Sequence, residues 1–600
     1  MALERVDIEK KYKWDLSAIY ESAAAFDADC KRVEEMIAAF TAHEGKMNES
    51  AAELLATLKD MAAIEFLIEK LWTYAYLGFT VDTSDNAAQA LVGRVRNLAV
   101  SAGEASWFVS PSIIRLDPAT VDGWYKECPE LESFRRSIEK GFREKPHTLS
   151  DECEKLLTKM DDCLGGHSNL RGIFANSDLR FGKMRGADGK SVELTDQTYV
   201  PMLMSSDRRV RQSAFRTLYK TYGQFGNTFA TMLAGYIKER TTLAKVRLFE
   251  DSITASTFSD EVTPVIYNSL ITAVSGGLPV LYDYYDLKRE VLGLEKLHLY
   301  DVYAPLIATQ SRKYSYEEAV EEVIKTVEVY GSEYADTLRA GLCERGWVDV
   351  YPTRGKRGGA FSAGCAATEP YILLNYNGTY NDMSTLAHEA GHSMHSYFSR
   401  KYNEPHNSSY TIFVAEVAST VNELLLAHRK LRESQSRDEK LYILNQLVET
   451  YKSTLYRQTM FAEFERELHA MTEKGMTLTA DLTNKTYYGI IKKYFGPRVA
   501  CDKQIAMEWM RIPHFFSAFY VYKYATCISA ASAIVKRIET EGAEYVGKYI
   551  EFLKCGGSRS PIDSLLVAGI DMRSPEVVSG AIEDFASTIA EFKALYCEKE

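Results

Sequence analysis

The sequence of 600 residues lacks the features of several specialised protein classes. It has no dense block of Lys or Arg and carries a formal net charge of −12, so neither nucleic acid nor an anionic membrane is an expected partner. No apolar run reaches the length that crosses a bilayer. Its ten cysteines include no C-x-x-C pair, which fits a reducing cytoplasm better than a disulfide framework. Peptides are the better partner for such a chain.

Breakers of regular structure are also scarce. Fifteen prolines in 600 residues leave long segments free to form uninterrupted helices. Apolar residues recur at helical spacing in residues 51–77, 87–109, 206–241 and 438–472. A short hairpin is predicted between residues 179–183 and 191–194. The first ten residues carry too many charges for a signal peptide. The sequence therefore predicts a mainly α-helical protein.

The most informative segment is His388-Glu389-Ala390-Gly391-His392. Residues four apart lie one above the other on a helix, so the two imidazoles can bind one cation. Glu389, turned roughly 100° from His388 around the axis, can reach water bound to that cation. This is the H-E-x-x-H geometry of zinc metalloproteases. The alternative is a buried helix whose two histidines make ordinary hydrogen bonds.

The residues around the motif favour a helix. Apolar residues at helical spacing predict one over residues 383–400, with Asn381-Asp382 as its N-cap. Gly391 inside this helix costs about 1 kcal/mol relative to alanine. We expect another backbone or a substrate to come close to Gly391, because such an approach explains the missing side chain.

A catalytic zinc site needs three protein ligands and one open position. The extended motif with a third histidine requires Gly at position 395 and His at position 398, where this chain has His395 and Phe398. Glu416 is the better candidate, because it interrupts an apolar helical run and a bare buried carboxylate is costly unless it is paired or bound to metal.

The neighbouring polar residues have lesser expected roles. Glu423 lies on the same helical face as Glu416 and is predicted to accept the outer ring N–H of a ligand histidine. Glu404 is a weaker ligand candidate, since Asn403-Glu404-Pro405 predicts a loop. His395 is expected at the helix surface or behind the ligands.

Several segments together carry a family resemblance. They are residues 385–396 and 413–419, the opening residues 13–20, the loop 355–362, and the late segments 511–516 and 520–525. In all of them the chain resembles oligoendopeptidase F, a member of the thimet-oligopeptidase-like zinc metallopeptidases. The resemblance spans the chain.

The resemblance implies a ligand set and a mechanism. By position, His388, His392 and Glu416 hold zinc, one ion per chain, and Glu389 is the general base. The expected reaction is attack of a zinc-bound water, activated by Glu389, on a peptide carbonyl.

The resemblance also places groups opposite the scissile carbonyl. In the family these are a histidine and tyrosines, which match His514, Tyr522 and Tyr524. Because Tyr520, Tyr522 and Tyr524 alternate, a shift of one position changes which tyrosine is meant. A hydroxyl or ring N–H there would stabilise the negative charge that builds on the carbonyl oxygen. From the residues alone, packing explains these tyrosines equally well in a chain with 38 of them.

For the fold, the resemblance implies a large helical, zincin-like metallopeptidase. A small β-sheet should lie beside the active-site helix, and lobes should enclose a deep channel that admits oligopeptides. Six hundred residues exceed one compact core. We expect an N-terminal helical region at 1–112, a second one of oligoendopeptidase F type at 113–190, and a catalytic zinc metallopeptidase region at 191–600.

Two segments before the zinc motif have predicted uses. Residues 369–376 predict a strand. Its edge could bind an extended peptide, or it could be an ordinary sheet strand, and the two interpretations are compatible. Residues 354–359 form no phosphate-binding loop, because Val350 and Arg357 stand where that motif needs Gly and Ser or Thr. We expect a mobile loop whose Lys356 and Arg357 meet a peptide carboxylate, or else a solvated basic loop.

Three functions remain open. The favoured one is a cytoplasmic zinc metalloendopeptidase that hydrolyses internal bonds of short oligopeptides, because ligands, base and candidate donors occur together. The second is a relative that removes dipeptides from C-termini. The third is a helical peptide-binding scaffold with an idle motif. The sequence leaves cleavage preference and oligomeric state undetermined.

Overall fold

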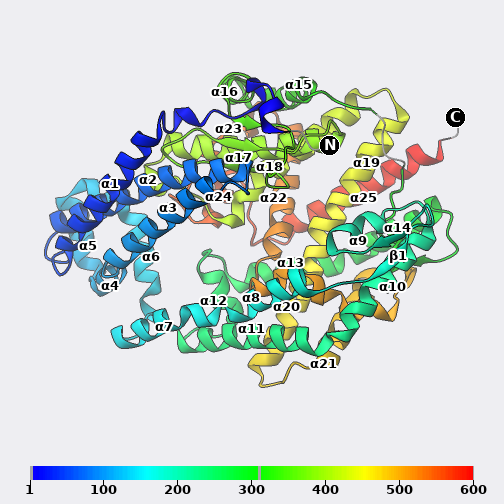
Figure 1. The fold of residues 1–600 in the computed structure, drawn as a ribbon, viewed down its shortest axis with the longest axis horizontal. Coiled ribbons are helices and arrows are strands. Elements are labelled where there is room, and N and C mark those ends of the chain that lie inside the picture. The colour runs from blue at the N-terminus through cyan, green and yellow to red at the C-terminus, as the bar shows by residue number, and fades with distance from the viewer. Residues whose placement is uncertain (1–3, 308–311, 599–600) are drawn as a thin grey trace. The chain divides into compact units, whose positions relative to one another are not determined.

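The protein consists of two compact units, each assembled from three separate segments. The structure, a computed structural model, describes residues 4–307 and 312–598, with Asp161 and Asp162 by their backbone alone (Figure 1). The first unit combines residues 1–146, 312–429 and 534–569, and the second combines residues 147–311, 430–533 and 570–600. Residues 1–3 of the segment considered for a signal peptide lie outside the described part. The three consecutive regions at 1–112, 113–190 and 191–600 stay a prediction, and so does the channel.

The first unit is mainly helical. Its helices are α1 (Ala23–Phe40), α2 (Ala51–Val81), α3 (Asn86–Ala105), α4 (Val109–Arg115), α5 (Pro118–Glu127), α6 (Arg135–Glu144), α15 (Tyr316–Val327), α16 (Ser332–Cys343), α17 (Tyr380–Tyr402), α23 (Ala543–Lys554) and α24 (Pro561–Val567), with most of α18 (Ile412–Glu433) and the end of α22 (Tyr522–Glu541). Helices α1, α2 and α3 pack side by side (Figure 1). Ser22, Ser50 and Asp85 cap their N-termini. The helices predicted at 51–77 and 87–109 are confirmed as α2 and α3.

A three-stranded sheet lies in the first unit. Its order is β4 (Val348–Asp349), β6 (Tyr371–Leu373) and β5 (Phe361–Ala363). The strand predicted at 369–376 is confirmed as the shorter β6. However, β6 pairs with β4 on one side and with β5 on the other, so the expectation that a peptide adds to its edge is wrong. Tyr371 and Leu373 instead pack into the core beneath α1 to α3.

The loop after β4 differs from the expectation of a mobile basic segment. The Lys356 side chain is fully buried, pairs with Asp349 at 2.7 Å, and donates to the carbonyls of Asp349 and Tyr351. Arg357 is exposed and bonds the Tyr76 hydroxyl of α2. Lys356 therefore holds its own loop together and cannot meet a peptide carboxylate.

The second unit is also helical. Its helices are α7 (Asp151–Leu164), α8 (Gly166–Ile173), α9 (Asp196–Leu203), α10 (Arg208–Gln224), α11 (Gly226–Val246), α12 (Ser252–Phe258), α13 (Pro264–Gly276), α14 (Leu278–Val291), α19 (Arg437–Tyr451), α20 (Arg457–Glu473), α21 (Ala480–Phe495) and α25 (Glu576–Cys597). The predicted helix 206–241 is two helices that break at Phe225, and 438–472 is interrupted by a π-helical turn, Lys452–Tyr456.

Strands of the second unit are short. The predicted hairpin is confirmed: β1 (Lys183–Arg185) runs antiparallel to β2 (Ser191–Glu193), with Met184 opposite Val192. Strands β3 (Leu297–His298) and β7 (Val499–Ala500) pair in parallel.

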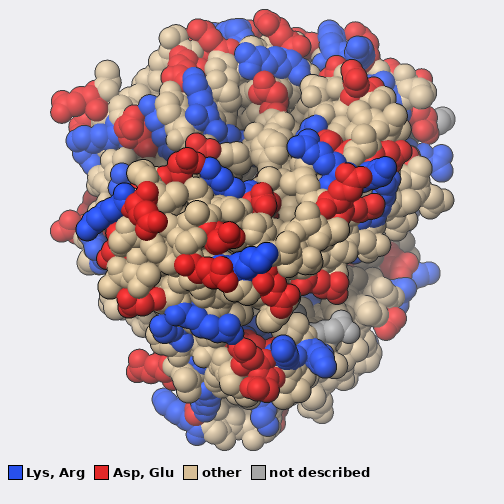
Figure 2. Space-filling view, turned by 90° about the vertical axis from the view of Figure 1, so that its left-hand side faces the viewer, with Lys and Arg blue, Asp and Glu red and all other residues tan. Residues whose placement is uncertain are grey.

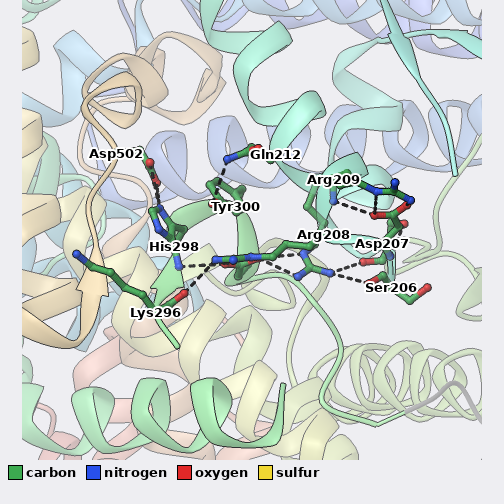
Figure 3. A network of polar contacts seen from close by, with 12 residues as sticks. Ser206, Asp207, Arg208, Arg209, Gln212, Lys296, His298, Tyr300 and Asp502 are labelled. Carbon is green, nitrogen blue, oxygen red and sulfur yellow. Dashed lines mark hydrogen bonds and ion pairs between the residues drawn. The ribbon is translucent and has the colours of Figure 1, made fainter. Parts of the chain in front are cut away.

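A buried carboxylate, Asp301, joins α10 to the segment after β3. Arg208 and Arg211 each reach it at 2.8 Å, and the backbone N–H of His298 donates to it at 3.1 Å. Figure 3 shows Arg208 also reaching the carbonyl of Lys296 at 3.0 Å. Two guanidinium groups satisfy the desolvated carboxylate, so this network fixes the start of α10.

Charged residues of both signs lie on the surface. On the face drawn in Figure 2, basic and acidic side chains are interspersed. Among the described residues, no single helix is both long and apolar enough to span a membrane; α13 and α14, bent by 48°, meet that test only as a pair. All ten cysteines are in the described part and are free thiols.

Candidate active site

Helix α17 carries the H-E-x-x-H motif and begins three residues earlier than predicted. Its N-cap is Thr379, whose hydroxyl accepts the Asp382 N–H at 3.1 Å while the Asp382 carboxylate accepts the Thr379 N–H at 2.8 Å. This reciprocal capping box satisfies two backbone donors. Asp382 therefore lies inside the first turn, and the predicted cap at Asn381-Asp382 is wrong.

Gly391 lies where α17 meets α18. A Cβ atom on Gly391 would be 2.6 Å from the Ala418 carbonyl oxygen and 2.6 Å from the Ser419 Cα. The expected approach of another backbone is confirmed, and that backbone belongs to the helix that carries Glu416.

Three candidate ligand atoms converge between the two helices. The Nε2 atoms of His388 and His392 are 3.2 Å apart, and Glu416 Oε2 lies 3.3 Å from the former and 3.5 Å from the latter. Ligands about 2.0–2.1 Å from a tetrahedral zinc ion are about 3.3 Å apart. These residues form the one group of three or more potential metal ligands found among the described residues. The donor set and its spacing fit zinc.

A second layer of contacts orients these ligands. Glu423 Oε2 lies 3.2 Å from His388 Nδ1, and Ser419 donates to Glu416 Oε2 at 3.2 Å. The partner predicted for Glu423 is thus found. A carboxylate on the outer nitrogen fixes the ring orientation and raises the basicity of the inner nitrogen.

The other two polar candidates lie away from the ligand atoms. Glu404 is exposed and is no part of the metal-ligand group. His395 is 1 % exposed and stacks on Tyr410 with centroids 3.8 Å apart. The surface position considered for His395 is therefore wrong, because the ring packs inside the unit.

The pKa values of His388 and Glu416 are shifted in opposite directions. Burial lowers the pKa of His388, but Glu423 and Glu416 outweigh it and raise this pKa well above its usual value. Burial raises the pKa of Glu416, but His388 and His392 outweigh it and hold this pKa well below its usual value. The carboxylates thus favour positive charge at the ring nitrogens, which is the charge that a bound cation supplies.

Glu389 lies on the buried side of α17. It is 5 % exposed, and its Oε2 is buried without a hydrogen-bond partner among the described residues. Burial raises the pKa of Glu389, although His388 and His392 oppose this shift. A buried carboxylate oxygen without a partner is costly in a structural role, so it fits a group that handles a proton during catalysis.

The late segment places its aromatic residues in two environments within the second unit. The rings of His514 and Tyr520 lie 6.3 Å apart, Tyr524 lies 6.3 Å from His514 and 5.4 Å from Tyr520, and the Tyr524 hydroxyl donates to that of Tyr520 at 3.4 Å. All three are partly exposed. Tyr522 is 0 % exposed and packs on Tyr267. Tyr522 is thus buried whereas Tyr520 and Tyr524 are partly exposed, and which of these tyrosines faces the scissile carbonyl stays a prediction.

Two side chains of the second unit hold the backbone at Ala518 and Phe519, a feature that the sequence analysis did not predict. Phe519 has a φ of 53°, a conformation that bulky residues rarely adopt. Its N–H donates to the buried Glu465 carboxylate at 2.7 Å, and the N–H of Ala518 donates to the Tyr236 hydroxyl at 2.9 Å. Burial raises the pKa of Glu465 to about 8. Nothing local distinguishes Glu465 from the other carboxylates of residues 438–472.

Comparison with known proteins places these observations in a family. Residues 201–584 match the model of peptidase family M3, and residues 112–181 match that of oligopeptidase F. The chain belongs to peptidase family M3. It is a metallo-oligopeptidase, a hydrolase, and the predicted resemblance to oligoendopeptidase F is confirmed.

Relatives of this M3 peptidase cover nearly its whole length. The oligopeptidase PepF of Bacillus subtilis is 38% identical over 99% of this chain and 88% of its own. The oligoendopeptidase F homolog of Borreliella burgdorferi is 37% identical over 99% of this chain and 100% of its own. A crystal structure of a putative peptidase from Chlamydophila abortus has a TM-score of 0.91 at 34% identity, covering 99% and 100%. The mainly helical fold with a small sheet is that of the family.

Proposed function

We propose that this M3 peptidase is a zinc-dependent endopeptidase for short oligopeptides, with one ion per chain held by His388, His392 and Glu416. The observation that carries the proposal is the convergence of three ligand atoms within 3.5 Å of one another. Relatives named oligoendopeptidase F support cleavage of internal bonds. The ten free cysteines support a reducing cytoplasm.

Each residue has a defined task in this proposal. Bound zinc would polarise the peptide carbonyl and lower the pKa of water at its open position to about 7. Glu389 accepts the proton of the attacking water at Oε2 and then passes it to the leaving amine. Glu423 keeps the His388 ring in the orientation that directs Nε2 toward the ligand group.

The donors of the late segment complete the proposal. Negative charge develops on the carbonyl oxygen in the transition state, and a hydrogen bond to it stabilises that state by roughly 3 kcal/mol. We assign this role to His514, Tyr520 and Tyr524, whose rings form one partly exposed cluster. Burial, followed by the charge of Arg171, lowers the pKa of His514, so the ring is neutral at pH 7 and offers one N–H.

Substitution of the base tests the assignment. Glu389→Gln removes the proton acceptor without touching a ligand, so zinc content should stay at one per chain while peptide turnover falls by a factor of at least 1,000, about 4 kcal/mol. Zinc content by mass spectrometry and hydrolysis of a fluorogenic peptide measure the two. Wild-type turnover in this variant would refute the role of Glu389.

The products decide between internal cleavage and removal of C-terminal dipeptides. A peptide amidated at its C-terminus has no terminal carboxylate for an exopeptidase to bind, and an endopeptidase should cleave it at an internal bond. Mass spectrometry of the fragments identifies that bond. Release of dipeptides alone, and only from the free acid, would contradict the proposal.

A further inference from the structure

The accessible stripe of the zinc helix extends beyond the ligands. Over residues 386–400 of α17, most side chains are buried. Apart from Tyr397, the partly exposed ones are His388, His392, Ser396 and Arg400. They follow one another at intervals of four, so they form one continuous stripe along the helix. Arg400 lies about 12 Å along the axis from His392, at 1.5 Å per residue.

Arg400 lines a cavity of the first unit. The cavity is about 440 Å³ and lies between α2, α17 and the segments 364–366 and 408–410, with Trp72, Ser396 and Tyr410 in its wall. The Arg400 Nη1 is buried and has no hydrogen-bond partner among the described residues. Burial lowers the pKa of Arg400, and the smaller opposing effects of Tyr410, Cys365, Glu69 and Glu369 do not outweigh it.

The cavity wall is shaped around this guanidinium group. A Cβ atom on Gly364 would lie 2.8 Å from the Arg400 Nη1 and 2.8 Å from the Glu369 carbonyl oxygen. Glu69 also lines the cavity, but no ion pair joins it to Arg400 among the described residues. Burial raises the pKa of Glu69, although the charge of Arg400 opposes this shift. A buried guanidinium group without a paired carboxylate is costly, and an anionic ligand would satisfy it.

We propose that Arg400 binds a carboxylate of the peptide substrate, either an acidic side chain or the C-terminal carboxylate, and thereby selects peptides by charge. This inference rests on the proposed peptidase function. At about 3.3 Å per residue of extended chain, 12 Å corresponds to about four residues from the scissile bond. Arg400 presents a planar fork of donors that matches a carboxylate, and Trp72 offers an apolar wall for the neighbouring part of the peptide.

Peptides that differ only in charge test the proposal. One cleavable sequence is made with Gln at each of the second to fifth positions on either side of the scissile bond, and with Glu at one of these positions at a time. Each peptide is prepared as free acid and as amide, so that the two sources of the carboxylate are separated. For the wild type, one Glu position or the free terminus should raise kcat/KM about tenfold, as for one charge-assisted hydrogen bond.

The variants locate the effect. The quantity to compare is kcat/KM for the peptide with the preferred carboxylate divided by kcat/KM for its uncharged counterpart. Arg400→Gln should reduce this ratio to near one, and Arg400→Lys should restore part of it. Lys401→Gln is the matched control, because it removes the same charge at the next residue of α17, where Lys401 pairs with Glu333; it should keep the wild-type ratio. In the Glu389→Gln background, which should not turn over substrate, calorimetry can measure the Kd of each peptide. The Kd of the uncharged peptide should exceed that of the charged peptide by the same ratio.

The outcomes separate the two proposals. Cleavage of all peptides at equal rates by the wild type, or an unchanged ratio in Arg400→Gln, would overturn the role of Arg400 and leave the peptidase function intact. Absence of any cleavage by zinc-loaded wild type would overturn the proposed function and this inference with it.

Discussion

Replacement of Gly391 by alanine tests how tightly the helix contact controls the metal ligands. The added Cβ would lie 2.6 Å from backbone atoms of Ala418 and Ser419, whereas ordinary contacts begin at 3.4 Å. Helix α18 must therefore move away by about 0.8 Å at this point. Glu416 is one turn earlier on α18 and would move with it. Zinc–ligand distances tolerate only about 0.2 Å.

The expected result is a folded protein that binds zinc poorly. Overpacking costs about 1–3 kcal/mol, and the better helix propensity of alanine offsets about 1 kcal/mol of this, so Gly391→Ala should fold. Because α17 and α18 would hold their ligands at the wrong separation, we expect zinc affinity to fall at least tenfold, about 1.4 kcal/mol. Competition with a chromogenic chelator measures the affinity, and circular dichroism verifies the fold.

A second glycine provides the control. Gly78 is interior to α2, and a Cβ there has no neighbour within 4 Å. Gly78→Ala should stabilise the protein by up to about 1 kcal/mol and leave zinc affinity unchanged. Wild-type zinc affinity and turnover in Gly391→Ala would refute the reasoning, because they would show that the α17–α18 contact does not set the ligand spacing.

Two further predictions concern groups that support the site. Glu423→Ala removes the carboxylate on His388 Nδ1 and should weaken zinc binding about 10- to 100-fold; unchanged chelator competition would contradict this. Glu465 has a pKa raised from 4.5 to about 8 by burial, so its contribution to stability is fully present below pH 4.5 and is lost as pH rises through about 8. In Glu465→Gln, urea unfolding at pH 5 and pH 9 should show less of this decline than the wild type, and an equal decline would exclude Glu465 as its source.

Local sequence rules predicted the helices that carry the candidate ligand group. The i, i+4 spacing of His388 and His392, the isolated carboxylate of Glu416 and the unusual Gly391 each have a local signature, and the structure brings all four together. The helix start was missed by three residues because Thr379 makes a capping box that competes with Asn381-Asp382.

Features set by tertiary packing escaped the sequence. Alternating tyrosines do not reveal that Tyr522 faces a core while Tyr520 and Tyr524 stay partly exposed. A basic loop does not reveal that Lys356 is neutralised by Asp349. Strand order is equally non-local, and it made β6 the central strand of its sheet. In each case the deciding partner comes from elsewhere in the fold.

Anomalous diffraction from crystals at the zinc absorption edge is the most direct test of the ligand set. The account predicts one strong peak per chain, about 2.0–2.1 Å from His388 Nε2, His392 Nε2 and the Glu416 carboxylate. A peak at any other group of residues, or none in protein that is fully active, would contradict it.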